Sequence, residues 1–312
     1  MAQAYNLWAK PAERVRSAIM GKPLLRWVLI LVCGLGLGPW ALQFLSEIKD
    51  ADGGHAATLL VGASPLLGVV KGLIVLLVAG GVGAMGAYFF SLGTGYTCAG
   101  LVLGWSAWGV STLGAMAHDR PLPMTTLAIE GAGVTLAAGL IAAWADLISR
   151  SRQPTERKAG AGGWRSLLAI DADGAAAPKA AWGALGLGVI TGGATVWFFA
   201  GSSDHGQVFV SVMCGAIAAG AAGQLFASAF GATLSPVTPI LSMGAVALLG
   251  PIIAGGVHGA GLVHAIYAGE VLPLARPLSL QWAGGAMLGA PIGIGWAGAM
   301  LDVRAAEFGA AS

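Results

Sequence analysis

The fold is decided by a stretch that occurs twice. Residues 120–146 read RPLPMTTLAIEGAGVTLAAGLIAAWAD, and residues 276–302 read RPLSLQWAGGAMLGAPIGIGWAGAMLD. At an offset of 156 residues the Arg-Pro-Leu triplets, two glycines and the closing aspartate coincide: Gly133 with Gly289, Gly139 with Gly295 and Asp146 with Asp302.

A weaker match precedes each copy at an offset of 144 residues. It pairs Ser91, Thr94 and Gly100 with Ser235, Thr238 and Gly244, in that order. Duplicated halves that run in the same direction build many membrane transporters, with binding sites where the halves meet. The two matches therefore predict an internal repeat.

The composition places these repeats in a membrane. Hydrophobic residues make up 56% of the 312 residues and charged residues only 10%, whereas soluble domains carry about 25% charged residues. A helix crosses a bilayer with about 20 apolar residues. Fifty-one glycines suit membrane helices, because glycine lets two backbones approach closely. We expect an all-α integral membrane protein of eight transmembrane helices, arranged as two parallel four-helix repeats.

Eight apolar blocks give the predicted spans and the domain boundaries. The spans cover about 24–45, 66–90, 96–117, 122–147, 182–200, 207–230, 238–263 and 280–302. The chain divides into a basic N-terminal segment (1–23), a first repeat (24–147), a hydrophilic linker (148–180), a second repeat (181–303) and a tail (304–312).

The distribution of basic residues predicts the orientation. Cytoplasmic loops carry an excess of Lys and Arg. With the N-terminus inside, twelve Lys and Arg lie in cytoplasmic segments and three in the opposite loops. Both termini and the linker are therefore expected in the cytoplasm, most simply at a bacterial inner membrane, and four spans per repeat make the halves parallel.

Two prolines interrupt the spans. Pro39 follows a glycine-rich run in the first span and is expected to bend that helix or to end its regular part. The second half carries twelve extra residues near 259–270, after Pro251. A helix broken at Pro251 that continues as a re-entrant piece fits this pattern, and so does a longer external loop with a short helix.

Two charged residues lie well inside predicted spans, away from the span ends. Glu130 lies eight residues into the fourth span, about 12 Å from its outer end at the helical rise. Lys71 lies at comparable depth in the second span. Charges at such depth face the bundle interior and mark functional sites by default. We predict that Glu130 faces the interior, with Lys71 as its partner, as an ion or proton site or as a structural pair.

Neutral polar residues are candidates for a solute path. Gln224 in the sixth span joins Glu130 and Lys71 in the predicted transport or ion site. Thr94, Thr97, Thr191 and Thr195 could line the same path, although such groups commonly form hydrogen bonds between helices.

Metal and cofactor chemistry is not expected. His258 and His264 are six residues apart, which does not put them on one helix face, and a contribution from His118 or Glu270 would need an accident of the fold. The three cysteines are isolated, whereas metal sites want clustered ligands. No nucleophile and base arrangement or nucleotide-binding motif is present in the sequence, so we expect no cofactor and no enzymatic activity.

A row of small residues marks the last span. Gly285, Gly289, Gly293 and Ala297 recur every fourth residue and form one smooth face. Such a face permits close helix packing, either between the two repeats or between protomers.

Two functions remain after these exclusions. The first is a channel or secondary carrier for a small solute or ion, with a path between the repeats. The alternative is a non-transporting subunit or scaffold of a larger membrane complex. The expected partners are the lipid bilayer and, for either function, further copies of the chain or other membrane subunits; a net charge of +2 argues against nucleic acid.

Overall fold

A computed structural model of the chain describes residues 23–48, 58–109, 112–116, 123–151, 169–170 and 176–310. The Arg-Pro-Leu triplet at 120–122, His118, the basic N-terminal segment and most of the linker at 148–180 lie outside the described residues.

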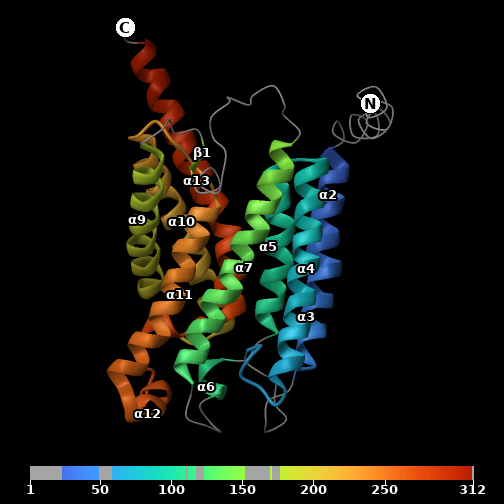
Figure 1. The fold of residues 1–312 in the computed structure, drawn as a ribbon, viewed down its shortest axis with the longest axis vertical. Helices are drawn as coiled ribbons and strands as arrows, with labels where there is room; N and C mark the ends of the chain where they lie inside the picture. The colour runs from blue at the N-terminus through green and yellow to red at the C-terminus, as the bar shows by residue number, and fades with distance from the viewer. Residues whose placement is uncertain are drawn as a thin grey trace.

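The first half of the chain consists of helices. They are α2 (Pro23–Val32), the π-helical turn η1 (Cys33–Leu37), α3 (Gly38–Ser46), α4 (Pro65–Phe89), α5 (Leu92–Trp108), the short α6 (Leu113–Met116) and α7 (Met124–Arg150). The segments α2, η1 and α3 follow each other directly and form one long helical segment (Figure 1).

The second half repeats this helical character. It contains α9 (Ala176–Phe199), α10 (His205–Ser228), α11 (Val237–His258), the 3-10 turn η3 (Gly259–Gly261), α12 (Leu262–Tyr267), the 3-10 turn η4 (Pro273–Ala275) and α13 (Ser279–Ala310). Two short strands, β1 (Ala169–Ile170) and β2 (Thr233–Leu234), pair antiparallel, so a short piece of the linker is extended.

The helices have the length and surface of membrane spans. Within the described residues, seven helical segments are long and apolar enough to cross a bilayer, and α5, with 17 residues, is the eighth long apolar helix. Large apolar side chains point outwards, including Phe198 at 79% exposure and Leu66 at 77%. Monomeric soluble proteins rarely expose contiguous apolar surface on this scale. The chain is a helical integral membrane protein, as the composition predicted.

The third span differs from its predicted bounds. We expected a span at 96–117, but α5 begins at Leu92, directly after Ser91, and ends at Trp108. Ser91 caps the helix, since its hydroxyl accepts a hydrogen bond from the backbone N–H of Thr94 at 3.2 Å. A serine cap satisfies an N–H that otherwise has no partner at a helix start, and this local bond fixes the start of α5 four residues earlier.

Pro39 does not end the first span. The five residues Cys33–Leu37 wind as a π-helix, and the α-helical pattern resumes at Gly38. A proline cannot donate the hydrogen bond that a regular helix needs at its position. The wider turn immediately before Pro39 is the local departure from the α-helix in this span.

Pro251 does not break the seventh span either. Helix α11 continues through Pro251 to His258, and the chain turns at Gly259, whose φ of 49° favours glycine. A 3-10 turn and α12 follow. The extra residues are therefore an extension with a short helix at the lower end of the bundle in Figure 1.

The long helices form one bundle with contacts between its halves. Helix α4 packs against α5 and α7, and α10 packs against α9 and α13. Helix α11 packs against α7 of the first half, and α13 packs against both α5 and α7 (Figure 1).

The hydroxyl groups of the helices mostly bond within their own helix. Thr191 and Thr195 each donate to the carbonyl four residues earlier, at 2.9 and 2.7 Å, and Thr97 donates to Gly93 O. Ser242 is different, because its hydroxyl also lies 3.0 Å from Leu185 O of α9. The threonines named as possible bonds between helices are thus engaged by their own helices or, for Thr94, by Ser91.

Candidate functional site

The Glu130 carboxylate lies where the two halves of the chain meet. Glu130 is in the second turn of α7, a helix that begins towards the lower end of the bundle in Figure 1, and is only 4% exposed. Its Oε1 accepts a hydrogen bond from Leu59 N at 2.9 Å and its Oε2 accepts one from Leu60 N at 2.8 Å. The hydroxyl of Ser279, the first residue of α13, donates to Oε1. The carboxylate therefore joins the chain before α4 to the start of α13.

The segment that Glu130 holds is irregular and close to α4. Residues 58–63 form bends without regular helix, and Thr58 Oγ1 accepts a hydrogen bond from Val61 N at 2.9 Å. Two glycines of α4 make room for it. A Cβ at Gly68 would lie 2.0 Å from Leu59 O, and one at Gly72 would lie 2.4 Å from Leu59 Cδ1. The glycine pattern of α4 thus lets this segment enter the bundle.

These hydrogen bonds compensate for burying the carboxylate. A buried charge is costly unless it is paired and hydrogen-bonded. Hydrogen bonds to an ionised acceptor are stronger than neutral ones. In turn, the N–H groups of the buried Leu59 and the partly buried Leu60 need an acceptor, since non-helical backbone at membrane depth must be satisfied by protein or water. The carboxylate and the segment stabilise each other.

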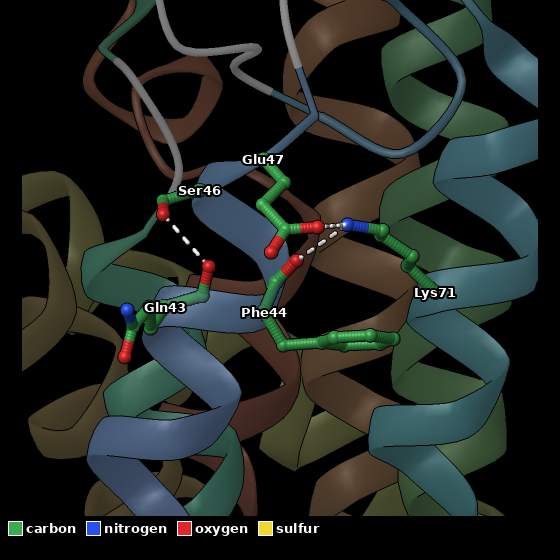
Figure 2. A network of polar contacts seen from close by, with 5 residues as sticks. All are labelled: Gln43, Phe44, Ser46, Glu47 and Lys71. Carbon is green, nitrogen blue, oxygen red and sulfur yellow. Dashed lines mark hydrogen bonds and ion pairs between the residues drawn. The ribbon is translucent and has the colours of Figure 1, made fainter.

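Lys71 has a different partner from the predicted one (Figure 2). Its Nζ forms an ion pair with Glu47, donates to Phe44 O at 3.0 Å, and lies 4.6 Å from the centroid of the Phe44 ring. The predicted pairing of Lys71 with Glu130 is wrong, because Glu130 takes backbone N–H groups instead. The lysine fastens the end of α3 to α4, and Glu47 is largely exposed at 67%.

Gln224 lies apart from Glu130. Its Oε1 accepts a hydrogen bond from Leu234 N at 2.8 Å. Leu234 belongs to β2, whose partner β1 lies at the upper end of the bundle in Figure 1. The three predicted transport residues therefore form three separate contacts, each of which holds a connecting segment or a helix end.

Arg276 is a buried cation that binds backbone carbonyls. It precedes α13 and is 7% exposed. Its guanidinium donates to Ala200 O and Gly269 O, each at 2.8 Å, and to Val271 O at 3.3 Å. Burial lowers the pKa of this guanidinium. Arg276 thus ties the α9–α10 connection and the chain after α12 to the start of α13.

The start of α13 is further fixed by its own side chains. Gln281 Oε1 accepts a hydrogen bond from Leu278 N at 2.8 Å, and Trp282 Nε1 donates to Pro277 O at 3.0 Å. Together with Arg276, these bonds hold Ser279 against Glu130.

The histidines lie at the end of the α11 extension. His258 is the last residue of α11, and His264 lies in α12 beyond the 3-10 turn. Among the described residues, no group of three or more His, Cys, Asp or Glu side chains gathers around a common point.

The glycine row of α13 packs within the second half. A Cβ at Gly289 would lie 2.3 Å from Met213 O, and one at Gly293 would lie 2.0 Å from Ile217 O, both of α10. Gly285 faces Val212 of α10 in the same way, and Ala297 is buried. The row was expected to face the other repeat or another protomer; its neighbour in the structure is α10.

Sequence reasoning missed the groups that complete the Glu130 site. Ser279 is 149 residues from Glu130, and the N–H groups of Leu59 and Leu60 belong to backbone, which no side-chain pattern marks. A weak signal existed in Gly68 and Gly72, whose four-residue spacing on α4 marks a face that something approaches closely.

No protein-family model, curated protein or solved structure matches the chain. The fold and the site define its class, which is a polytopic helical membrane protein.

Proposed function

We propose that the protein is a secondary carrier or channel for a small solute or ion, with its path between two parallel four-helix repeats. Glu130 is the ion- or proton-responsive group of this path, on the outer side of the membrane. The observation that carries the proposal is the buried carboxylate that joins the chain before α4 to α13.

The pairing of the helices supports the repeat. In the repeat, α5 corresponds to α11 and α7 corresponds to α13. A two-fold axis that exchanges the halves would therefore convert the contact of α5 with α13 into the contact of α11 with α7. The same axis would relate α7 to α13, so these two helices are expected to lie together. All three contacts occur. The matched glycines agree as well, because Gly100 of α5 faces Leu288 of α13 and Gly244 of α11 faces Thr135 of α7.

The matched serines also occupy like positions. Ser91 caps α5, and the hydroxyl of Ser235 accepts a hydrogen bond from Val237 N at the start of α11. Thr94 and Thr238 are both fully buried. The same Ser-x-x-Thr pattern therefore opens the third long helix of each half.

The orientation follows from the basic residues. We place the start of α2 and the end of α13, which both lie at the upper end in Figure 1, on the cytoplasmic side. A cysteine introduced at Gly160 should then react with a membrane-impermeant maleimide only from the inside. Labelling from the outer face would contradict this orientation.

The chemistry of Glu130 links charge to structure. An ionised carboxylate only accepts hydrogen bonds, whereas a protonated one also donates. A proton or a cation that engages the oxygens of Glu130 competes with Leu59 N, Leu60 N and the Ser279 hydroxyl. Loss of these bonds frees the irregular segment from α13 and opens the path between the halves on the outer side.

Reconstitution tests this function. The purified chain is placed in liposomes, and swelling is followed by light scattering in a panel of small neutral and ionic solutes, with proton movement followed by a trapped pH-sensitive dye. We expect flux of at least one solute or of protons for the native chain. In Glu130→Gln this flux should be lost if the protein is a carrier, because a carrier held open on one side cannot complete its cycle, and it should rise above the native rate if the protein is a channel. Glu270→Gln, which changes an exposed carboxylate near the same end, is the matched control and should retain the native rate. Flux equal to that of empty liposomes throughout, or the native rate in Glu130→Gln, would contradict the proposal.

A non-transporting subunit is the second candidate. Close packing favours it: Gly284 of α13 lies against the backbone of α5 at Leu103 and Gly104, with 3.0 Å between its added Cβ and the nearest atoms. Each of Glu130, Lys71 and Gln224 also has a structural partner. Purification in a mild detergent with a stoichiometric partner protein, together with absence of flux, would support this function.

A further inference from the structure

Arg276 carries a buried donor that has no acceptor in the described part of the chain. Three buried side-chain nitrogens there lack a hydrogen-bond partner: His205 Nδ1, His258 Nε2 and Arg276 Nε. Of these three residues, Arg276 is the one that is always charged and more than nine-tenths buried, at 7% exposure. Buried polar groups in folded proteins are paired with few exceptions. The Nε–H of Arg276 therefore calls for an acceptor.

The positive charge of Arg276 also has no carboxylate beside it. Its hydrogen bonds go to backbone carbonyls of the α9–α10 connection and of the chain after α12. The ion pairs among the described residues do not include it. Glu270 lies in the same stretch of chain but is exposed, and Asp204 accepts a hydrogen bond from Ser202 at 2.8 Å. Buried charges are paired as a rule, so this guanidinium lacks a counter-charge.

Two long helices begin on the same side as this guanidinium. Helices α10 and α13 run parallel, because Gly285 lies against Val212 and Gly293 lies against Ile217 one turn further along both helices. Arg276 precedes the start of α13 by three residues and bonds to the connection that leads into α10. A helix N-terminus carries roughly half a positive charge. The two helix starts thus add to the positive potential at Arg276 and favour an anion.

The chain segments that cover Arg276 lie at the surface. Gly201, which follows the carbonyl of Ala200, is exposed, and so is Gly269, whose own carbonyl accepts from Arg276. Both segments, and Arg276 itself, lie between the membrane-spanning lengths of the helices. A small ion from the water on this side therefore reaches the guanidinium by displacing a connection between helices, and it does not have to cross the helix bundle.

We propose that Arg276 is the centre of a binding site for a small monovalent inorganic anion. The Nε–H donates to the anion, and the starts of α10 and α13 stabilise its charge. A monovalent anion fits because one negative charge balances the single uncompensated charge of the guanidinium. The bound anion stabilises the contact of the α9–α10 connection and the chain after α12 with the start of α13. The site does not depend on the transport proposed above.

Chloride is the probe. The purified full-length chain is placed in sodium gluconate, and chloride then replaces gluconate at constant ionic strength. A ligand that binds only the folded state stabilises that state increasingly as its concentration rises. We expect the melting temperature of the native chain to rise by several degrees with chloride. Equilibrium dialysis with radioactive chloride should find one bound ion per chain.

Variants locate the bound ion. In Arg276→Gln both the binding and the rise in melting temperature should disappear, whereas Arg26→Gln, which removes an exposed cation of α2, should keep both. If Arg276→Gln does not fold, Arg276→Lys replaces it. This variant keeps the charge but has no Nε–H, and it should bind chloride at least several-fold more weakly.

Two results would overturn the proposal. Absence of bound chloride from the native chain would mean that water is the acceptor for the Nε–H. Chloride binding that is unchanged in Arg276→Gln or in Arg276→Lys would place the anion elsewhere on the protein.

Discussion

Two of the contacts that hold helix α13 depend on different physical means. At its start, Ser279 bonds to the Glu130 carboxylate of the other half. Along its length, Gly285, Gly289 and Gly293 lie against the backbone of α10 in its own half. The first contact depends on charge and polar geometry, and the second depends on shape and van der Waals packing.

This difference separates a contact that can switch from one that cannot. A proton or cation changes what a carboxylate can bond to, whereas nothing in the chemistry of a glycine face responds to such a ligand. Close packing of small residues is a common basis of helix association in membranes. We therefore expect α13 to move with α10, and the contact between the halves at Glu130 to be the one that opens.

Removing the carboxylate should have the largest effect. Glu130→Ala leaves the N–H groups of Leu59 and Leu60 without their acceptor, and each buried unsatisfied group costs about 1–3 kcal/mol. Thermal or denaturant unfolding in detergent should show a loss of roughly 2–5 kcal/mol. Glu270→Ala is the exposed control, and equal stability of the two variants would show that Glu130 does not hold this segment.

Widening the glycine face should have the next largest effect. Gly293→Ala places a Cβ 2.0 Å from Ile217 O, so α10 and α13 must separate, at a cost of roughly 1–3 kcal/mol. Gly295→Ala is the matched control, because a Cβ there meets nothing within 4 Å. The same unfolding measurement should show that the Gly293→Ala variant is clearly less stable than the Gly295→Ala variant. The reverse order would refute the close contact of α13 with α10.

The ion pair between the buried Lys71 and the exposed Glu47 should matter less. Glu47→Gln removes the charged partner of Lys71, yet Glu47 is 67% exposed, and exposed ion pairs contribute about 0–1 kcal/mol. The loss of stability should shrink further at high salt, since salt screens exposed charges. A loss as large as that of Glu130→Ala would show that the buried Lys71 ammonium depends on the charge of Glu47.

The smallest effect should be the coupling free energy between Glu130 and Lys71. If they were a buried pair, replacing both would restore the stability lost by replacing one. Their observed partners differ, so the stability losses of Glu130→Gln and Lys71→Met should add to within about 0.5 kcal/mol. Recovery of stability in the double variant, measured by a double-mutant cycle, would support the direct pairing of Glu130 with Lys71 that the sequence predicted.

Local chemistry explains which features could be predicted from the sequence. The apolar blocks predicted the membrane helices, because burial of apolar side chains in lipid sets helix length. The depth of Glu130 predicted its interior position, and the buried carboxylate confirms this. The start of α5 and the partners of Glu130 could not be predicted, since they depend on a serine cap and on backbone N–H groups brought together by the fold.

The effect of each proline on its helix was equally hard to predict from the sequence. Pro39 and Pro251 each predicted an interruption, but a π-helical turn precedes the first and α11 continues through the second. A proline removes one hydrogen bond, and the neighbouring helices decide whether the chain continues. The partner of Lys71 was missed for a related reason, because Glu47 follows the first span and reaches Lys71 only when α3 packs beside α4.

We propose that the Glu130 carboxylate keeps the irregular segment closed against α13 through its bonds to Leu59 N, Leu60 N and the Ser279 hydroxyl. It is tested most directly by the reactivity of Leu60→Cys, in a background without the native cysteines, towards a membrane-impermeant maleimide added from the outer face. We predict slow labelling when residue 130 is Glu and labelling at least several-fold faster with Glu130→Gln, while Glu270→Gln leaves the rate unchanged. Equal labelling rates for Glu130 and Glu130→Gln would contradict the claim.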